Sequence, residues 1–207
     1  MPTDLLLTDR TRETRDKLLR VAREVFEEDG FDGASVSRIV SESNVSRGTF
    51  YLYFESKEDI FRTLAEDLLS QVVELQRPEE IDPRETIRRT IAAFVVYYRE
   101  HARLMAVLEQ VATHDESFRT LRRDMRRGVA ERAVRFIAAL QRKGVVPATV
   151  DPRYAATALT GMVDRFAYVW LVLEEDFEEA EVVENLSTIW FQAIGGVVSG
   201  PAAGAAG

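Results

Sequence analysis

The sequence predicts an all-α protein in which an N-terminal three-helix domain with a helix-turn-helix precedes a larger C-terminal helical domain, with about nine helices in total. Three observations lead to this prediction. Apolar residues recur along the chain at the 3.6-residue period of amphipathic helices. Residues that cap or break helices divide the chain into helix-sized segments. No segment shows the alternation that is typical of a strand.

The first helix is indicated by an apolar stripe that ends at Gly30 and consists of Leu18, Val21, Ala22, Val25 and Phe26. Two short helices follow, and Ser35 and Ser46 can cap them because a serine hydroxyl accepts the free N–H groups of a first turn. Asn44 lies where the first short helix must end, and asparagine tolerates the left-handed conformation of such a turn. A longer helix is predicted from Lys57 to about Gln76.

Further helices are predicted after a break at residues 77–80. Asp82 and Pro83 mark a helix start, because aspartate can cap and proline fits the first helical position. The predicted helices cover about 83–100, 103–112, 116–143, 152–173 and 179–198. The sequence thus predicts domains at 10–56 and 57–198, and a tail at 199–207 that has little to bury and should be disordered.

The composition excludes several classes of protein. The chain has 207 residues, of which 46% are hydrophobic and 30% charged, as expected for a globular protein. It has no cysteine, which removes disulfides, thiolate catalysis and cysteine-ligated zinc. No apolar run reaches the ~20 residues of a membrane span, so we expect a cytoplasmic protein without a membrane partner. His101 and His114 are far apart, and we predict no metal site and no cofactor.

Hydroxyl, basic and phenolic side chains remain outward when the apolar faces of the two short helices are buried. Such groups bond phosphate oxygens and base edges, and a helix-turn-helix presents them to the major groove of DNA. The predicted DNA-binding residues are Ser37, Arg38, Ser46, Arg47, Gly48, Thr49, Tyr51, Tyr53 and Lys57. An ordinary solvated surface is the alternative interpretation. Leu52 could contact a thymine methyl or weaken phosphate binding.

The stretch from about Arg15 to Leu64 resembles the DNA-binding domain of TetR-family transcriptional regulators. The resemblance rests on the segments 22–31, 35–40 and 45–58, and above all on the run Thr49-Phe50-Tyr51 to Phe54 with Ser56-Lys57. It implies that Arg47 and Gly48 approach base edges, while Thr49, Tyr51, Tyr53 and Lys57 hold phosphates. It also implies a homodimer formed by the last two helices and a small-molecule effector held in the C-terminal domain.

The charge of the chain is unusual for a DNA-binding protein. The formal net charge is −8, and residues 1–64 hold ten Lys or Arg against thirteen Asp or Glu, a net charge of −3. DNA binding must then depend on where the charges are placed, and we expect it to weaken steeply with salt.

Two apolar sets in the C-terminal part carry further predictions. An effector cavity would be lined by Phe94, Tyr97, Tyr98, Met105, Phe118, Met125, Met162 and Phe166. The dimer interface would include Ala155, Leu159, Trp170, Leu186, Trp190 and Ala193. For both sets the alternative is that the side chains form the core of a single protomer.

Charge is also divided unevenly in this part. Residues 117–143 hold nine Lys or Arg against two acids, and residues 174–184 hold seven acids with no Lys or Arg. The two stretches could pair with each other within or across a dimer. Alternatively, Arg122, Arg123, Arg126 and Arg127 could attract an anionic effector such as an acyl-CoA.

The sequence therefore predicts a ligand-responsive transcriptional regulator, a repressor that binds a palindromic DNA operator as a dimer and is released by a small, largely apolar effector. An activator of the same fold and a helical protein-binding adaptor are the alternatives. We do not predict an enzyme, because the sequence has no Gly-rich phosphate loop, no His-Glu-x-x-His and no nucleophile elbow.

Overall fold

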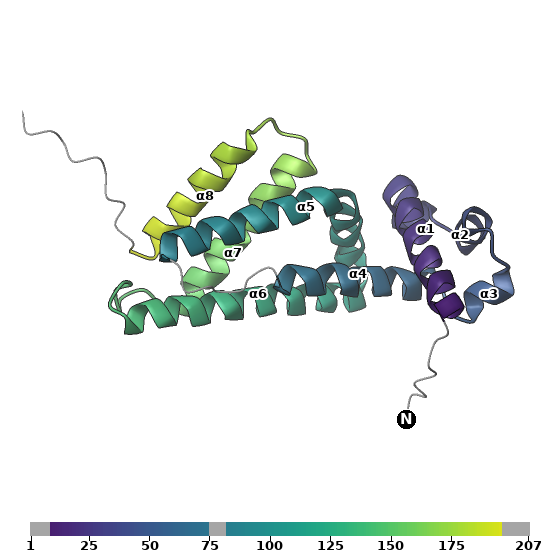
Figure 1. Cartoon of the computed structure of the whole chain (residues 1–207), viewed down its shortest axis with the longest axis horizontal. Helices are drawn as coiled ribbons and strands as arrows, with labels where there is room; N and C mark the ends of the chain where they lie inside the picture. Colours follow the sequence, from purple (N-terminus) through teal and green to yellow (C-terminus); the bar gives the residue numbers. More distant parts are fainter. Residues whose placement is uncertain (1–8, 75–81, 196–207) are drawn as a thin grey trace, which may run out of the picture. The chain divides into compact units, whose positions relative to one another are not determined.

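The computed structural model describes residues 9–74 and 82–195, and within these ranges it consists of eight α-helices without a strand (Figure 1). The helices are α1 (Asp9–Gly33), α2 (Val36–Ser43), α3 (Arg47–Tyr51), α4 (Lys57–Glu74), α5 (Pro83–His114), α6 (Glu116–Arg142), α7 (Pro152–Leu171) and α8 (Glu179–Ala193). None of them is long and apolar enough to cross a membrane. The predicted all-α fold is confirmed.

The helix count differs from the prediction at one point. The helices predicted at 83–100 and 103–112 are the single helix α5, because the junction Glu100-His101-Ala102 contains neither proline nor glycine to end a helix. The tail predicted to be disordered, 199–207, lies outside the described residues, as does the end of the predicted last helix.

The short-range start and stop signals act as predicted. The hydroxyls of Ser35 and Ser46 accept the backbone N–H groups of Arg38 and Thr49. Asn44 adopts the left-handed conformation, with φ 51° and ψ 45°. Gly30 interrupts the helical geometry of α1 with φ 70° and ψ 177°, a conformation that is favourable for glycine alone.

The chain divides into two compact units. The N-terminal unit comprises Met1–Leu69 and Arg103–Leu121, and the C-terminal unit comprises Ser70–Ala102 and Arg122–Gly207. The division falls inside α4, α5 and α6, so three helices are shared between the units. The domain boundary predicted at 56/57 stays a prediction.

The N-terminal unit is held together by aromatic side chains that come from distant parts of the sequence. The Phe61 ring lies 4.8 Å from that of Phe26 and 5.2 Å from that of Phe118, measured between ring centroids. Phe31 lies 5.1 Å from Phe61 and 6.0 Å from Phe118. Phe118 is fully buried in this cluster, with the Arg62 guanidinium 4.9 Å from its centroid. The cluster thus packs α1, α4 and the start of α6 together.

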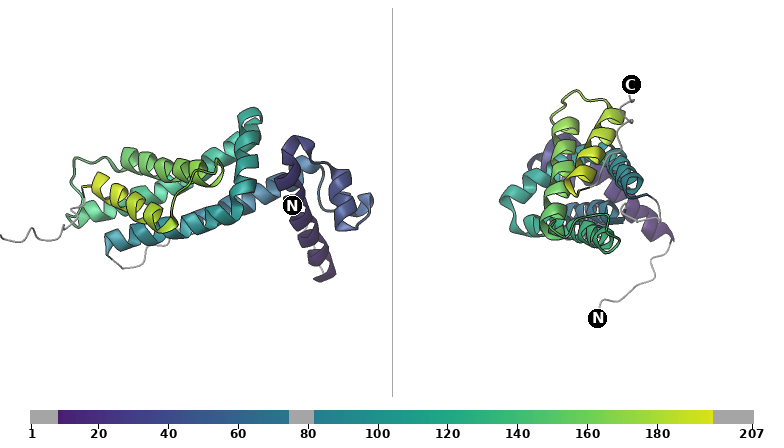
Figure 2. Two further views of the ribbon diagram at one scale, coloured as in Figure 1. Left: turned by 90° about the horizontal axis from the view of Figure 1, so that it is seen from above. Right: turned by 90° about the vertical axis from the view of Figure 1, so that its left-hand side faces the viewer.

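The C-terminal unit has a separate apolar core formed by α5, α6, α7 and α8, in which α7 and α8 form an antiparallel pair (Figures 1 and 2). This core includes Leu159, Trp170, Leu186 and Trp190, which are each at most 7% exposed. These four residues pack against other side chains of the same protomer, and their assignment to a dimer interface stays a prediction. Of the predicted interface residues, Ala193 is exposed and Ala155 is half-buried.

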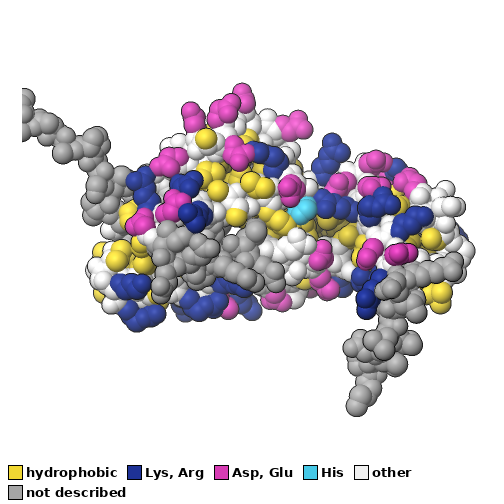
Figure 3. Space-filling model, in the orientation of Figure 1, with side chains coloured by type: hydrophobic (Ala, Val, Ile, Leu, Met, Phe, Trp, Pro, Cys, Tyr) yellow, Lys and Arg dark blue, Asp and Glu magenta, His cyan; other side chains and the backbone are white. Residues whose placement is uncertain are grey.

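Acidic side chains gather over the loop between α7 and α8 (Figure 3). Two ion pairs of this acidic stretch go to α5, where Arg84 lies 2.7 Å from Glu184 and Arg99 pairs with Glu179. The guanidinium of Arg99 also lies 5.0 Å from the centroid of Trp170. Within one protomer, the acidic stretch thus pairs with α5, and its pairing with residues 117–143 stays a prediction.

Candidate nucleic-acid interface

The helix-turn-helix brings the predicted DNA-binding residues of α2 and α3 onto one surface. Phe50 is the only residue of α3 that is fully buried, so the remaining residues of this short helix point outward or sideways. Ser46 caps α3 through the Thr49 N–H at 2.9 Å and also hydrogen-bonds the Thr49 hydroxyl at 2.8 Å. Both hydroxyls are therefore held at the start of the helix.

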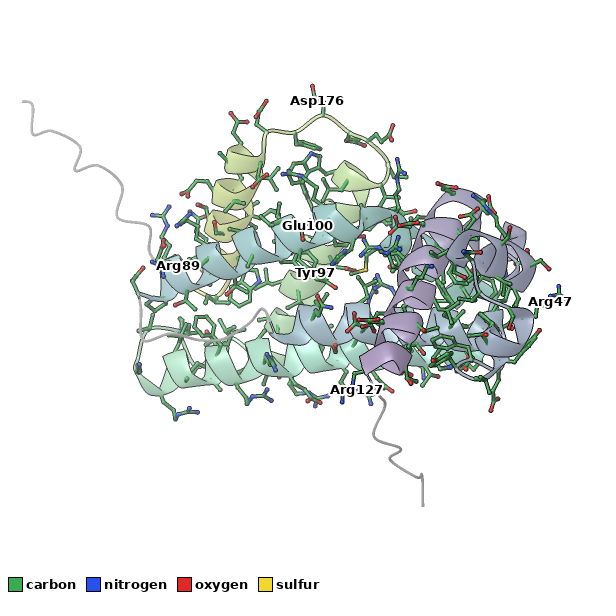
Figure 4. The ribbon with its side chains drawn as sticks, turned by 45° about the vertical axis from the view of Figure 1, so that its right-hand side comes forward. Arg47, Arg89, Tyr97, Glu100, Arg127 and Asp176 are labelled. Atoms are coloured by element: carbon green, nitrogen blue, oxygen red, sulfur yellow. The ribbon has the colours of Figure 1, made fainter. Side chains whose placement is uncertain are left out.

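Arg47 lies at the outer edge of the N-terminal unit and points into solvent (Figure 4). Its guanidinium donates a hydrogen bond to the hydroxyl of Ser37, which comes from α2. Ser37 is itself a predicted DNA-binding residue, and in the structure its hydroxyl also accepts a hydrogen bond from Arg47. A long side chain that is held by a neighbour loses less rotamer freedom when it binds a base.

Arg38 is engaged inside the protein. Its guanidinium forms ion pairs with Glu28 and Asp29 of α1 and with Glu42, the last at 2.7 Å. The hydrogen bonds that Arg38 donates to these carboxylates, of which the one to Asp29 has the largest effect, raise the pKa of Arg38. The sequence did not reveal this role, because Glu28 and Asp29 are ten and nine residues away.

Lys57 is likewise directed at the protein. Its ammonium donates to the backbone carbonyls of Phe31 at 2.8 Å, Ala34 at 3.2 Å and Asp32 at 3.4 Å. It also lies 4.8 Å from the centroid of the Phe31 ring. The three donors of the ammonium thus close the end of α1, where backbone carbonyls lack helical partners.

These contacts explain how an acidic domain can present a cationic surface. Arg38 neutralises three carboxylates close to the helix-turn-helix, and Arg23 pairs with Glu27 at 2.7 Å. Arg47, by contrast, bonds a neutral hydroxyl and keeps its full charge on the surface.

The residues predicted to line an effector cavity do not all lie in one unit. Met105 and Phe118 belong to the N-terminal unit, where Phe118 packs in the aromatic cluster described above, and its place in an effector cavity stays a prediction. The other six residues belong to the C-terminal unit. Tyr98 is buried, whereas Phe94, Met125, Met162 and Phe166 are half-buried.

An open groove lies on α5 and includes one predicted residue, Tyr97. Figure 4 shows Tyr97 and Glu100 on the same helix. The other lining residues, Ala92, Ala93, Val96 and Glu100, were not predicted from the sequence. Among the described residues, no cluster of His, Asp or Glu is arranged to hold a metal ion.

A buried polar cluster lies inside the C-terminal unit. The Arg122 side chain is only 6% exposed, and its Nη2 atom lies 3.4 Å from Oδ2 of Asp164. Nη2 of Arg126 lies 2.8 Å from the same oxygen. Burial lowers the pKa of Arg122. Burial also raises the pKa of the nearby Tyr98 phenol, and the charge of Asp164 raises it further.

Comparison with known proteins agrees with this geometry. The family model described as bacterial regulatory proteins, tetR family, matches residues 18–64. The model described as the C-terminal domain of the transcriptional regulator EthR matches residues 87–196, which is more than half of the chain.

Similar proteins extend over most of the chain. The fatty acid metabolism regulator protein of Bacillus subtilis is 24% identical over 170 residues, which cover 78% of this chain and 86% of that protein. The transcriptional regulator EthR of Mycolicibacterium smegmatis is 28% identical over 187 residues, 87% of this chain and 86% of that protein. The fatty acid degradation regulator FadR of Bacillus halodurans has the same fold, with a TM-score of 0.74 at 21% identity over 89% of this chain and 96% of that chain.

The exposed surface of α3 and the two family matches lead to the same conclusion. The chain belongs to the TetR family of helix-turn-helix transcriptional regulators, which are DNA-binding proteins and not enzymes, and its C-terminal domain is of the EthR type.

Proposed function

We propose that the protein is a ligand-responsive repressor that binds a palindromic operator as a homodimer and is released by a small, largely apolar effector with an anionic group, such as an acyl-CoA. The observation that carries the DNA-binding part is the exposed Arg47, held by Ser37 on a capped helix-turn-helix. Ser46, Gly48, Thr49, Tyr51 and Tyr53 complete the proposed surface, and Arg38 and Lys57 contribute to it mainly by fixing α1 and α2.

Dimerisation is supported by the outer face of α7 and α8. Tyr154, Ala158 and Gly161 lie on the exposed side of α7, and Ile189 and Ala193 lie on that of α8. A Cβ added to Gly161 would meet nothing within 4 Å, so the protomer itself does not need this glycine. Glycine inside a helix costs about 1 kcal/mol relative to alanine, and the close approach of a second helix would account for it. A dimer would present two copies of α3 to half-sites about 34 Å apart.

The anionic nature of the effector is supported by the buried Arg122 cluster. The buried Arg122 and the exposed Arg126 share one carboxylate oxygen of Asp164, in the unit that also holds the C-terminal apolar core. Guanidinium groups recognise carboxylates and phosphates through paired hydrogen bonds. An amphiphile could place its anionic head at these arginines and its apolar chain against the apolar side chains of the same unit. The relatives that regulate fatty acid metabolism are consistent with this class.

Fluorescence anisotropy with the DNA upstream of the protein's own gene, beside a scrambled duplex and at several salt concentrations, tests the DNA-binding part. We expect tight binding to the upstream DNA alone, two chains per duplex, and steep weakening with salt. Equal weak binding to both duplexes would contradict a repressor of its own gene. In vitro transcription distinguishes the activator of the same fold, which would raise the amount of transcript.

The effector is tested on the same complex with palmitoyl-CoA, palmitate and the neutral hexadecanol. We expect the anionic compounds to release the DNA and hexadecanol to have little effect. Arg122→Met should lose the response and keep DNA binding, whereas Arg135→Met, at an exposed position on the same helix, should behave as the wild type. Release by hexadecanol alone would contradict an anionic effector.

A further inference from the structure

The side chain of Leu52 is the most solvent-exposed large apolar group in the described residues. It is 82% exposed, although it directly follows α3 on the DNA-facing part of the protein. Its backbone stays helical, with φ −75° and ψ −22°, and its N–H is bonded to the carbonyl of Thr49. The protein's own core therefore does not use this side chain, and its helical position fixes the direction in which it points.

Leu52 lies at the centre of the outward face of α3. Successive residues of a helix turn by about 100°, so Gly48 and Leu52 are one turn apart and each lies about 160° from the buried Phe50. The side chain of Leu52 thus projects directly away from the core. Arg47 and Tyr51 lie on one flank of this line, and Thr49 lies on the other.

The second observation is the space beside Leu52. A Cβ on Gly48 would meet only the hydroxyl of Ser46, at an ordinary contact distance of 3.6 Å. The protein's own packing therefore does not require a glycine at this position, although glycine weakens a helix. On the outward face, the absent side chain of Gly48 thus leaves a gap next to the projecting apolar side chain of Leu52.

Resting on the proposed function, we infer that Leu52, beside the gap at Gly48, is a specificity-determining residue that contacts the 5-methyl group of a thymine in each operator half-site. The thymine methyl is the only apolar group on the base edges of the major groove. The surrounding side chains, Arg47, Thr49 and Tyr51, are hydrogen-bonding groups that suit the polar edges and phosphates beside it.

The test removes only the methyl group. The full-length chain first selects duplexes from a random pool, and each thymine of the selected duplex is then replaced by deoxyuridine, which lacks the 5-methyl group and keeps the same hydrogen bonds. In each half-site, we expect the replacement of one particular thymine, made singly, to weaken binding about fourfold, which is the effect of one buried methyl group. Other replacements should have smaller effects.

Two variants assign the effect to Leu52. Leu52→Ala should bind the selected duplex more weakly and should no longer distinguish thymine from uracil at that position. Leu173→Ala removes another exposed leucine, from the segment between α7 and α8, and should keep the wild-type discrimination. Because Leu52 lies outside the core, both variants should unfold at the wild-type temperature.

The outcomes that overturn the inference are distinct from those that overturn the proposed function. A selection that enriches no duplex would overturn both. A selected duplex that is indifferent to every uracil, or a Leu52→Ala variant that keeps the uracil penalty, would overturn the role of Leu52 alone.

Discussion

The two units use their side chains in different ways. In the N-terminal unit, polar and charged groups such as Ser37, Arg38 and Lys57 hold neighbouring side chains and the backbone in place, so the proposed DNA-binding surface is arranged without DNA. In the C-terminal unit, large aromatic groups such as Trp170 and Trp190 fill the core, and the outer faces of α7 and α8 carry small or isolated apolar groups. The polar side chains of the first unit therefore lie on its surface, whereas the aromatic side chains of the second are enclosed.

The largest effect should come from Phe118, which the sequence pattern favoured as an effector contact and the structure places in the N-terminal core. Phe118→Ala should lower the free energy of unfolding by about 3–5 kcal/mol, because a fully buried ring is lost and a cavity remains. Urea unfolding measures this, with Phe166→Ala at a half-buried position as the smaller comparison. If Phe118→Ala keeps full stability and loses the effector response, Phe118 contacts the effector and is not needed for the core.

Lys57 should affect folding more than DNA contact. Lys57→Met keeps much of the apolar stem and removes the bonds to three carbonyls, so we expect a loss of about 1.5–3 kcal/mol in unfolding free energy. The unfolding midpoint in urea is the measurement. A variant that unfolds like the wild type and binds every duplex more weakly would show that Lys57 contacts phosphate.

Arg47 should behave in the opposite way. Arg47→Ala should leave stability unchanged and weaken operator binding by about 1–3 kcal/mol per contact, with relaxed discrimination between duplexes. Ser37→Ala should give a smaller loss in the same direction, because the arginine remains but is no longer held. Anisotropy with the operator and a scrambled duplex measures both, and uniform weakening on the two duplexes would assign Arg47 to phosphate binding.

The outer face of the C-terminal unit can be tested at neighbouring positions of α8. Ile189 is 47% exposed and Trp190 only 5%. Ile189→Asp should weaken the dimer at least tenfold, about 1.4 kcal/mol, without unfolding the protomer. Trp190→Ala should instead lower the stability of the protomer, because a buried ring is lost. Light scattering during gel filtration measures the mass of the assembly. If Ile189→Asp remains a dimer, this face is not the dimer interface.

The smallest effect concerns the surface of α5. Hydrogen bonds from Arg88 and then Arg89 lower the pKa of Glu85 from 4.5 to about 2. Because the folded pKa is below the unfolded one, the stabilisation is present above pH 4.5 and is lost as the pH falls toward 2. The difference in melting temperature between the wild type and Glu85→Gln should therefore be small at pH 7 and smaller at pH 3. A constant difference would contradict this role of the ion pairs.

The parts of the fold that depend on neighbouring residues could be predicted from the sequence. Ser35, Ser46 and Asn44 act within three or four positions of themselves, and the structure shows them as predicted. The break predicted between residues 100 and 103 was wrong, although the absence of proline and glycine there already favoured a continuous helix.

The parts that depend on distant residues could not be predicted. Lys57 bonds carbonyls that precede it by 23–26 residues, and no local pattern indicates such a contact. An apolar stripe shows that Trp190 and Leu186 are buried but does not show what buries them. The interface prediction at these positions therefore stays a prediction, and the exposed residues between them are the ones that a second chain could reach.

The division between the units inside α4, α5 and α6 has a consequence for building chimaeras with other family members. Exchanging one unit for that of a relative requires three joints, between residues 69 and 70, 102 and 103, and 121 and 122, each inside a helix. One residue too many or too few at a joint rotates everything beyond it by about 100°. Functional hybrids should therefore be found only when the residue count of each helix is kept across its joint.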